Sequence, residues 1–140
     1  MYQKDYILRM IDMLGELVRA IIGLIARGDY RQAEQKLTEA YLTFLRKDAS
    51  FFNSIPVDKL TAKLLTEHNY TQGHLEILAE LFNAEALLRE ARGNHGESMV
   101  FYEKSLKLFE FTDEAYRTYS VDRQAKMERI RKRILEIKEL

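Results

Sequence analysis

A pattern of small and bulky residues occurs twice in this chain, at a turn and along the segment that follows it. In the first copy the turn is Gly28-Asp29-Tyr30, and the residues that follow at fixed offsets are Ala33, Leu37, Ala40, Tyr41 and Phe44. In the second copy the turn is Gly93-Asn94-His95, and the same offsets hold Ser98, Tyr102, Ser105, Leu106 and Phe109. Small residues at two fixed places let two helix backbones approach closely, so we expect Ala40 and Ser105 to be buried where paired helices touch. The pattern therefore predicts antiparallel helical pairs, each closed by a tight turn.

Composition favours a single all-helical domain over residues 1–140. A chain of 140 residues is of ordinary size for one domain. One proline and six glycines leave little material for turns between short strands. The 22 basic residues equal the 22 acidic ones, which argues against a nucleic-acid-binding protein.

Location is indicated by cysteine content and by hydropathy. The chain has no cysteine, which excludes a disulfide framework and a thiolate metal site and is typical of a reducing compartment. The most apolar stretch, residues 17–26, carries Arg19 and is far shorter than the roughly 20 residues of a membrane-spanning helix. Asp5 and Asp12 interrupt the only region where a signal peptide would lie. We expect a cytoplasmic protein without membrane contact.

Periodicity and capping residues predict about six helices. The expected helices cover residues 3–27, 29–47 and 57–66, a long segment from Thr71 to Gly93, a segment ending near Phe111, and a last helix starting at 112–114. Gly28 suits a left-handed helix end. Asp29 with Gln32, and Asn94 with Glu97, have the spacing of capping boxes.

The first helix has an apolar arc wider than that of an ordinary surface helix. A second copy of the chain would cover it, so we expect a homodimer whose interface includes Ile7, Ile11, Leu14, Val18 and Ile22. The competing interpretation is that the last helix folds back over the arc. That helix has an apolar seam made of Met127, Ile130, Ile134 and Ile137.

These features resemble the tetratricopeptide repeat. Its consensus has a small residue in a first helix, then glycine, an acid and an aromatic residue at the turn, then alanine, aromatic and alanine in a second helix. Phe82 and Ala86 occupy first-helix places in the second copy. The departures are Ile21 in place of a small residue, Glu85 and Arg89 in place of apolar ones, and the missing closing proline. The resemblance implies antiparallel pairs stacked as a short right-handed superhelix.

The two copies are separated by about twice the roughly 34-residue period of that repeat. The section between them carries no clear motif, and the sequence does not decide whether residues 48–70 form a degenerate repeat. The opening residues DYILRMIDMLGELVRAI also look similar to a family of small bacterial helical proteins of unknown function. That second resemblance implies no activity.

The residues that carry enzyme or metal chemistry are sparse. His68, His74 and His95 are the only histidines, and none has an acid at the spacing of a helical zinc motif. No nucleophile signature, glycine-rich phosphate loop or paired-carboxylate motif is present. We therefore expect no catalytic, cofactor-binding or metal-binding residues, and we do not expect an enzyme.

Two charged features have alternative interpretations. Glu85 and Arg89 are four residues apart, so they either pair on the helix surface or face a partner across the groove that such first helices line. The last helix carries a basic cluster of Arg123, Lys126, Arg129, Arg131, Lys132 and Arg133. Intrahelical ion pairs on a solvated face are favoured for this cluster over contact with an anionic partner.

The hypothesis that follows is a non-catalytic interaction or adaptor module that holds a protein or peptide partner. It rests on the stacked architecture and on analogy with repeat proteins. The alternative is a structural or regulatory homodimer that uses its apolar N-terminal helix as the interface. A small-ligand binder or enzyme is the third and least favoured class.

Overall fold

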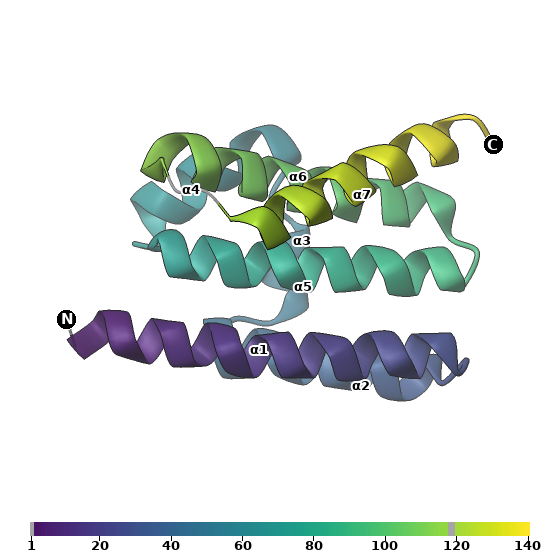
Figure 1. The fold of residues 1–140 in the computed structure, drawn as a ribbon, viewed down its shortest axis with the longest axis horizontal. Helices are drawn as coiled ribbons and strands as arrows, with labels where there is room; N and C mark the ends of the chain where they lie inside the picture. The colour runs from purple at the N-terminus through teal and green to yellow at the C-terminus, as the bar shows by residue number, and fades with distance from the viewer. Residues whose placement is uncertain (1, 118–119) are drawn as a thin grey trace.

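The structure is a computed structural model that describes the backbone of residues 2–117 and 120–140 and the side chains of residues 8–117 and 120–140. This part of the chain contains seven α-helices and no strand (Figure 1). They are α1 (Tyr2–Ala26), α2 (Tyr30–Ala40), α3 (Ala49–Asn53), α4 (Leu60–Glu67), α5 (Gln72–Ala91), α6 (His95–Tyr116) and α7 (Val121–Lys138). A π-helical turn, Tyr41–Leu45, extends α2, and a 3₁₀ turn, Val57–Lys59, leads into α4. None of the described helices combines the length and the hydropathy needed to cross a membrane.

The two copies of the repeated pattern form the same kind of turn. Gly28 and Gly93 have φ angles of 80° and 82°, a left-handed conformation that glycine adopts without steric cost. The N–H groups of each glycine and of the next residue bond back to carbonyls of the preceding helix at 2.9–3.0 Å, in the pairs Gly28–Ile25, Asp29–Leu24, Gly93–Glu90 and Asn94–Arg89. This is the Schellman arrangement, so the left-handed glycine expected from the sequence is confirmed.

The N-caps of α2 and α6 also match. The side chains of Asp29 and Asn94 accept hydrogen bonds at 3.3 Å from the backbone N–H groups of Gln32 and Glu97. These bonds satisfy one free N–H group at the start of each helix. At the second turn the carboxylate of Glu97 pairs with Arg89 instead of returning to its own N-cap.

Four of the positions that correspond between the two copies are buried in both. The buried pairs are Ala33 and Ser98, Leu37 and Tyr102, Ala40 and Ser105, and Phe44 and Phe109. The hydroxyl of Ser105 donates to the Ala79 carbonyl at 2.7 Å, so this small polar side chain joins α6 directly to α5. The expectation that Ala40 and Ser105 are buried is confirmed.

Helix α5 lies at the centre of the molecule. It packs against α1 and α2 on one side and against α6 on the other, while α7 packs on α6 (Figure 1). Because α5 has neighbours on several sides, its buried residues lie almost all around it: Leu75, Ile77, Leu78, Ala79, Leu81, Phe82, Ala84, Glu85, Ala86 and Leu88. Such a helix has no single apolar stripe.

Two helix boundaries differ from the sequence-based prediction. Thr112 does not begin the last helix, since α6 continues through it to Tyr116. The Thr112 side chain is buried, and its hydroxyl donates to the Leu108 carbonyl one turn earlier, so it is satisfied inside the helix. The last helix begins at Val121, where Ser120 acts as N-cap by accepting from the Arg123 N–H at 3.2 Å.

The middle segment contains a helix that the sequence pattern did not predict. Asp48 is the N-cap of α3, and its carboxylate accepts from the Phe51 N–H at 3.0 Å and from the Ser50 hydroxyl at 2.8 Å. Residues 48–70 thus form two short helices, α3 and α4, around the proline-containing turn. Thr71 is the N-cap of α5, as expected, and His74 completes its capping box.

Candidate functional site

The three histidines lie at helix ends. His68 meets the ring of Phe51 edge-on, with centroids 4.8 Å apart, and His74 stacks on Tyr70 at 4.9 Å. The Nδ1 atom of His74 accepts from the Thr71 N–H at 3.1 Å, so this ring serves the capping of α5. His95, at the aromatic position of the repeat turn, is exposed and has no packing role there. Within the described residues, no group of three or more His, Cys, Asp or Glu side chains is placed to hold a metal ion.

Glu85 and Arg89 form an ion pair on α5, with 3.3 Å between Arg89 Nε and Glu85 Oε2. Arg89 also pairs with Glu97 of α6, and its guanidinium lies 5.2 Å from the centre of the Phe101 ring. Glu85 is only 6% exposed. The pair therefore joins α5 to α6, and most of its polar surface is used within the chain.

Burial dominates the electrostatics of this pair. Burial raises the pKa of the Glu85 carboxyl, and Arg89 lowers that pKa by less. Burial, and then the negative charge of Glu85, raise the pKa of Tyr41 well above its usual value. The Tyr41 hydroxyl is buried close to the Glu85 carboxyl, and the interaction between the two side chains raises the pKa of Tyr41 further. A buried carboxyl and a buried hydroxyl thus lie together where the π-helical turn meets α5.

Replacing Glu85 with Gln is expected to change how stability depends on pH. Because the folded pKa of Glu85 is raised above 4.5, the folded chain keeps a proton that the unfolded chain has already lost. The stabilisation from that proton is complete below about pH 4.5 and is lost as the pH rises through the folded pKa. Glu85→Gln should therefore gain stability relative to the wild type between about pH 4.5 and neutrality. Urea unfolding of both proteins at several pH values measures this difference.

The matched control is Glu39→Gln, which removes an exposed carboxylate from α2. If the free energies of unfolding of Glu85→Gln and the wild type differ by the same amount at every pH in this range, the prediction of a buried, ionisable Glu85 is contradicted.

The apolar arc of α1 is covered in part by the chain itself. Leu14 and Val18 are buried, Ile11 is half-buried, and Ile22 is 41% exposed. The side chain of Ile7 lies outside the described residues. Leu8 and Met13, at 52% and 60% exposed, add apolar surface on opposite flanks of the buried stripe. The seam of α7, made of Met127, Ile130, Ile134 and Ile137, is buried and belongs to the same apolar core.

A pocket with a volume of about 190 Å³ lies where α1, α5, α6 and the start of α7 meet. Its lining residues are Ile11, Leu14, Gly15, Glu76, Ile77, Glu80, Phe109, Ser120, Asp122, Arg123 and Lys126. The α1 and α6 residues give it an apolar side, while α5 and α7 supply charged groups. No pattern in the amino-acid sequence predicts this pocket, because its walls come from four segments that are distant along the chain.

The basic cluster of α7 pairs mainly with neighbouring helices. Ion pairs join α7 to α5 and α6 in the combinations Arg123–Glu76, Arg123–Asp113, Lys126–Glu80, Arg133–Glu90 and Arg131–Glu110. Among the ion pairs that α7 forms with described residues, only Arg133–Glu136, at 2.7 Å, is intrahelical. The favoured interpretation of a face held by intrahelical pairs is therefore wrong for most of this cluster. The physical reason is that α7 lies within side-chain reach of a stripe of carboxylates on α5.

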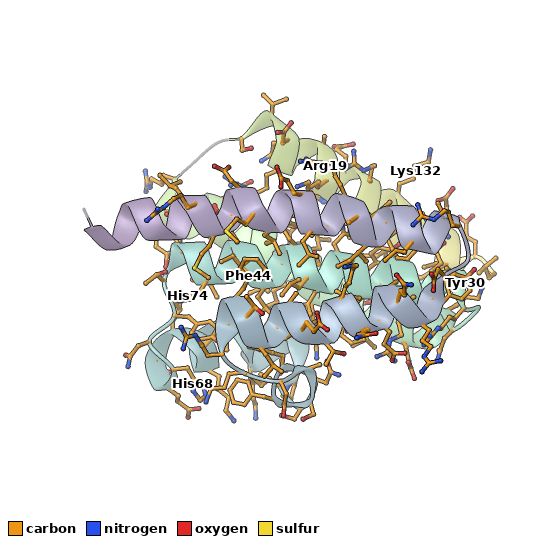
Figure 2. All side chains as sticks on the ribbon, turned by 90° about the horizontal axis from the view of Figure 1, so that it is seen from below. Arg19, Tyr30, Phe44, His68, His74 and Lys132 are labelled. Atoms are coloured by element: carbon orange, nitrogen blue, oxygen red, sulfur yellow. The ribbon has the colours of Figure 1, made fainter. Side chains whose placement is uncertain are left out.

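Three cations of the α7 cluster are exposed at the surface, and of these only Arg131 is in one of the ion pairs above. Arg129 and Lys132 are exposed, and Figure 2 shows Lys132 on the same side of the molecule as Arg19 of α1. Inside the pocket, by contrast, the cations and the hydroxyl already have partners: Arg123 and Lys126 are in ion pairs, and Ser120 caps α7.

Comparisons of the chain with models of protein families, with curated proteins and with solved structures found no match.

Proposed function

We propose that this chain is a non-catalytic interaction module, built from tetratricopeptide-like antiparallel helical pairs, that holds a segment of a partner protein. The single observation that carries the proposal is the equivalence of the two turns. Both have a left-handed glycine, the same Schellman bonds and an Asp or Asn N-cap with nearly equal backbone angles (φ −89°, ψ 68° and φ −94°, ψ 78°). Two turns this similar, each followed by buried small residues, support an internal repeat.

The arrangement of the helices supports stacking of the two pairs. The first pair would be α1 with α2, and the second α5 with α6, each joined by one of the equivalent turns. Helix α5 contacts both members of the first pair, and α7 follows on α6. Stacked pairs of this kind would form a short right-handed superhelix. In repeat proteins stacking buries a continuous core and leaves one extended face for binding.

We place the partner surface over the pocket, where α1, α5 and α7 meet. Two exposed apolar side chains border this region. Leu8, 52% exposed, is three residues before the pocket residue Ile11 and so shares its face of α1. Val121, 72% exposed, lies between the pocket residues Ser120 and Asp122. Exposed apolar residues beside a pocket are typical of a surface that receives an apolar side chain of a partner.

Site-specific crosslinking tests this placement. A photo-crosslinking residue is introduced at Leu8 or at Val121 in the intact chain, and adducts formed in cells are identified by mass spectrometry. The same partner protein is expected from both positions. The control position is Gln35, an exposed residue of α2. Adducts that are identical at all three positions, or that are absent at Leu8 and Val121, would contradict the proposal.

A homodimer through α1 is the alternative, and the exposure of Ile22 favours it. Light scattering at micromolar concentration distinguishes the two functions. If α1 forms the interface, Ile22→Glu should give a monomer, whereas Arg9→Glu on the polar stripe should not. A monomeric mass for the wild type at every concentration would remove this alternative. For either function we propose a cytoplasmic location, which the absence of cysteine supports.

A further inference from the structure

The pocket between α1, α5, α6 and α7 has an apolar side wall and an excess of acidic groups. The apolar wall consists of Ile11 and Leu14 from α1, Ile77 from α5 and Phe109 from α6. Its charged lining residues are three acids, Glu76, Glu80 and Asp122, and two bases, Arg123 and Lys126. A ligand that fits both parts therefore has an apolar body and a charged end.

The sign of that charge follows from which pocket groups are still available. Arg123 is held by Glu76 at 3.1 Å and by Asp113 at 2.5 Å, and Lys126 is held by Glu80. Both cations of the pocket are thus already neutralised. An anionic ligand would have to displace one of these carboxylates, which makes phosphate or carboxylate ligands a poor match.

Negative charge, by contrast, remains incompletely paired at the pocket. Asp122 is exposed at the pocket edge and takes part in none of the ion pairs of the described residues. Glu80 binds Lys126 through Oε2, while its Oε1 is buried without a hydrogen-bond partner in the part of the chain that the structure describes. The last torsion of a glutamate side chain is broad, so a small rotation turns Oε1 toward a donor in the pocket.

The surroundings of the neighbouring Glu76 also favour a positively charged ligand. Burial raises the pKa of Glu76, Arg123 lowers it, and the negative charges of Glu80 and Asp113 raise it further. Burial is the largest cause of the raised pKa, and Arg123 lowers the pKa by more than Glu80 or Asp113 alone raises it. An added positive charge near the partly buried Glu76 would stabilise its ionised form.

The volume restricts what that cation is. About 190 Å³ is smaller than the roughly 300–1,000 Å³ of pockets that enclose drug-sized molecules. It suits one narrow side chain, and lysine has a flexible apolar stem that ends in a compact ammonium group with three donors. The planar guanidinium of arginine is wider and fits two parallel carboxylate oxygens better than separate ones.

We propose that this pocket receives a lysine side chain of the partner protein, with its methylene stem on Ile11 and Leu14 and its ammonium group at Glu80 and Asp122. This inference rests on the proposed function, because it names the chemistry of the partner segment at the same surface. The partner surface is then not purely apolar. An apolar residue of the partner protein, in contact with Leu8 and Val121, would lie next to the partner's buried lysine.

Small probes test the charge and the shape separately. Backbone amide NMR spectra of the full chain are recorded with n-butylammonium, n-butanol and butyrate at millimolar concentration. The expected result is a saturable shift of amides in the first half of α5 and at the start of α7 with n-butylammonium alone. Equal shifts with n-butanol, or shifts with butyrate, would overturn the charge assignment, and so would the absence of any shift.

Two variants and one control locate the ammonium group. Asp122→Asn and Glu80→Gln should each weaken n-butylammonium binding by about threefold or more, the scale of a partly exposed ion pair. Asp122 is exposed at the first turn of α7, so its variant keeps the test valid if Glu80→Gln disturbs the ion pair with Lys126. The control Glu39→Gln should bind like the wild type. Unchanged binding in Asp122→Asn would overturn the proposal.

A lysine amide separates a side chain from a free amine. Nα-acetyl-lysine N-methylamide is expected to bind at least as well as n-butylammonium. Binding of n-butylammonium without binding of the lysine amide would mean that the ligand is a free amine, and the side-chain proposal would fail. If crosslinking identifies a partner whose binding is unchanged by Asp122→Asn, the lysine inference fails while the interaction function stands.

Discussion

Phe82→Ala should lower the free energy of unfolding by about 3–5 kcal/mol. Phe82 is fully buried on α5, and its ring centre lies 5.7 Å from that of Phe101 on α6 and 6.4 Å from those of Tyr41 and Phe52. Removing it empties the point where four separate segments meet. Since a domain of this kind is stable by roughly 5–15 kcal/mol, the loss is about a fifth or more of the total. Denaturant unfolding followed by far-UV circular dichroism measures it.

The control for Phe82 is Tyr116→Ala, at the exposed end of α6, which should cost less than about 1 kcal/mol. If the two variants lose similar amounts of stability, the aromatic cluster around Phe82 does not hold α5 to its neighbours as the structure has it.

Lys104→Glu should lower the free energy of unfolding by a similar amount, about 3–5 kcal/mol. The cause is the negative charge of the new side chain more than its size. Lys104 is only 3% exposed, and its Nζ donates to the carbonyls of Phe52 at 3.5 Å and Asn53 at 3.4 Å, at the end of α3. The ammonium group also lies 5.7 Å and 5.9 Å from the ring centres of Phe82 and Phe101. A carboxylate at this place would face carbonyl oxygens and aromatic rings that offer it no donor.

Lys104→Met separates charge from volume. Methionine fills a similar volume but cannot donate hydrogen bonds to the two carbonyls. We therefore expect a smaller loss in the free energy of unfolding, about 1–3 kcal/mol. Lys132→Glu, an exposed reversal on α7, should stay within about 0.5 kcal/mol of the wild type. A Lys104→Glu variant as stable as Lys132→Glu would show that Lys104 is not enclosed between α3, α5 and α6.

The position of Lys104 also explains why the middle segment is ordered. Helix α3 has only five residues and cannot be stable alone in water. Its C-terminal carbonyls are bound by a cation from α6, and Phe52 packs into the aromatic cluster. Nothing in residues 48–54 predicts a lysine that lies about fifty positions later in the chain.

The amino-acid sequence by itself determined the local features of this protein. The all-helical class, the left-handed Gly28 and Gly93, the N-caps at Asp29, Asn94 and Thr71, and the burial of Ala40 and Ser105 all follow from patterns within a few residues. These features depend on backbone sterics and on hydrogen bonds between near neighbours, which local sequence contains.

Only the tertiary structure decided which charges meet. Glu85 is buried beside Arg89, and the cations of α7 reach carboxylates on α5 in place of neighbours on their own helix. The sequence-based prediction ended α6 too early for a related reason. Thr112 is buried inside α6 and does not act as an exposed N-cap of the next helix. The pocket with Glu80 and Asp122 likewise exists only because four segments converge. Long side chains find partners by distance in space, and helix packing sets that distance independently of the spacing along the chain.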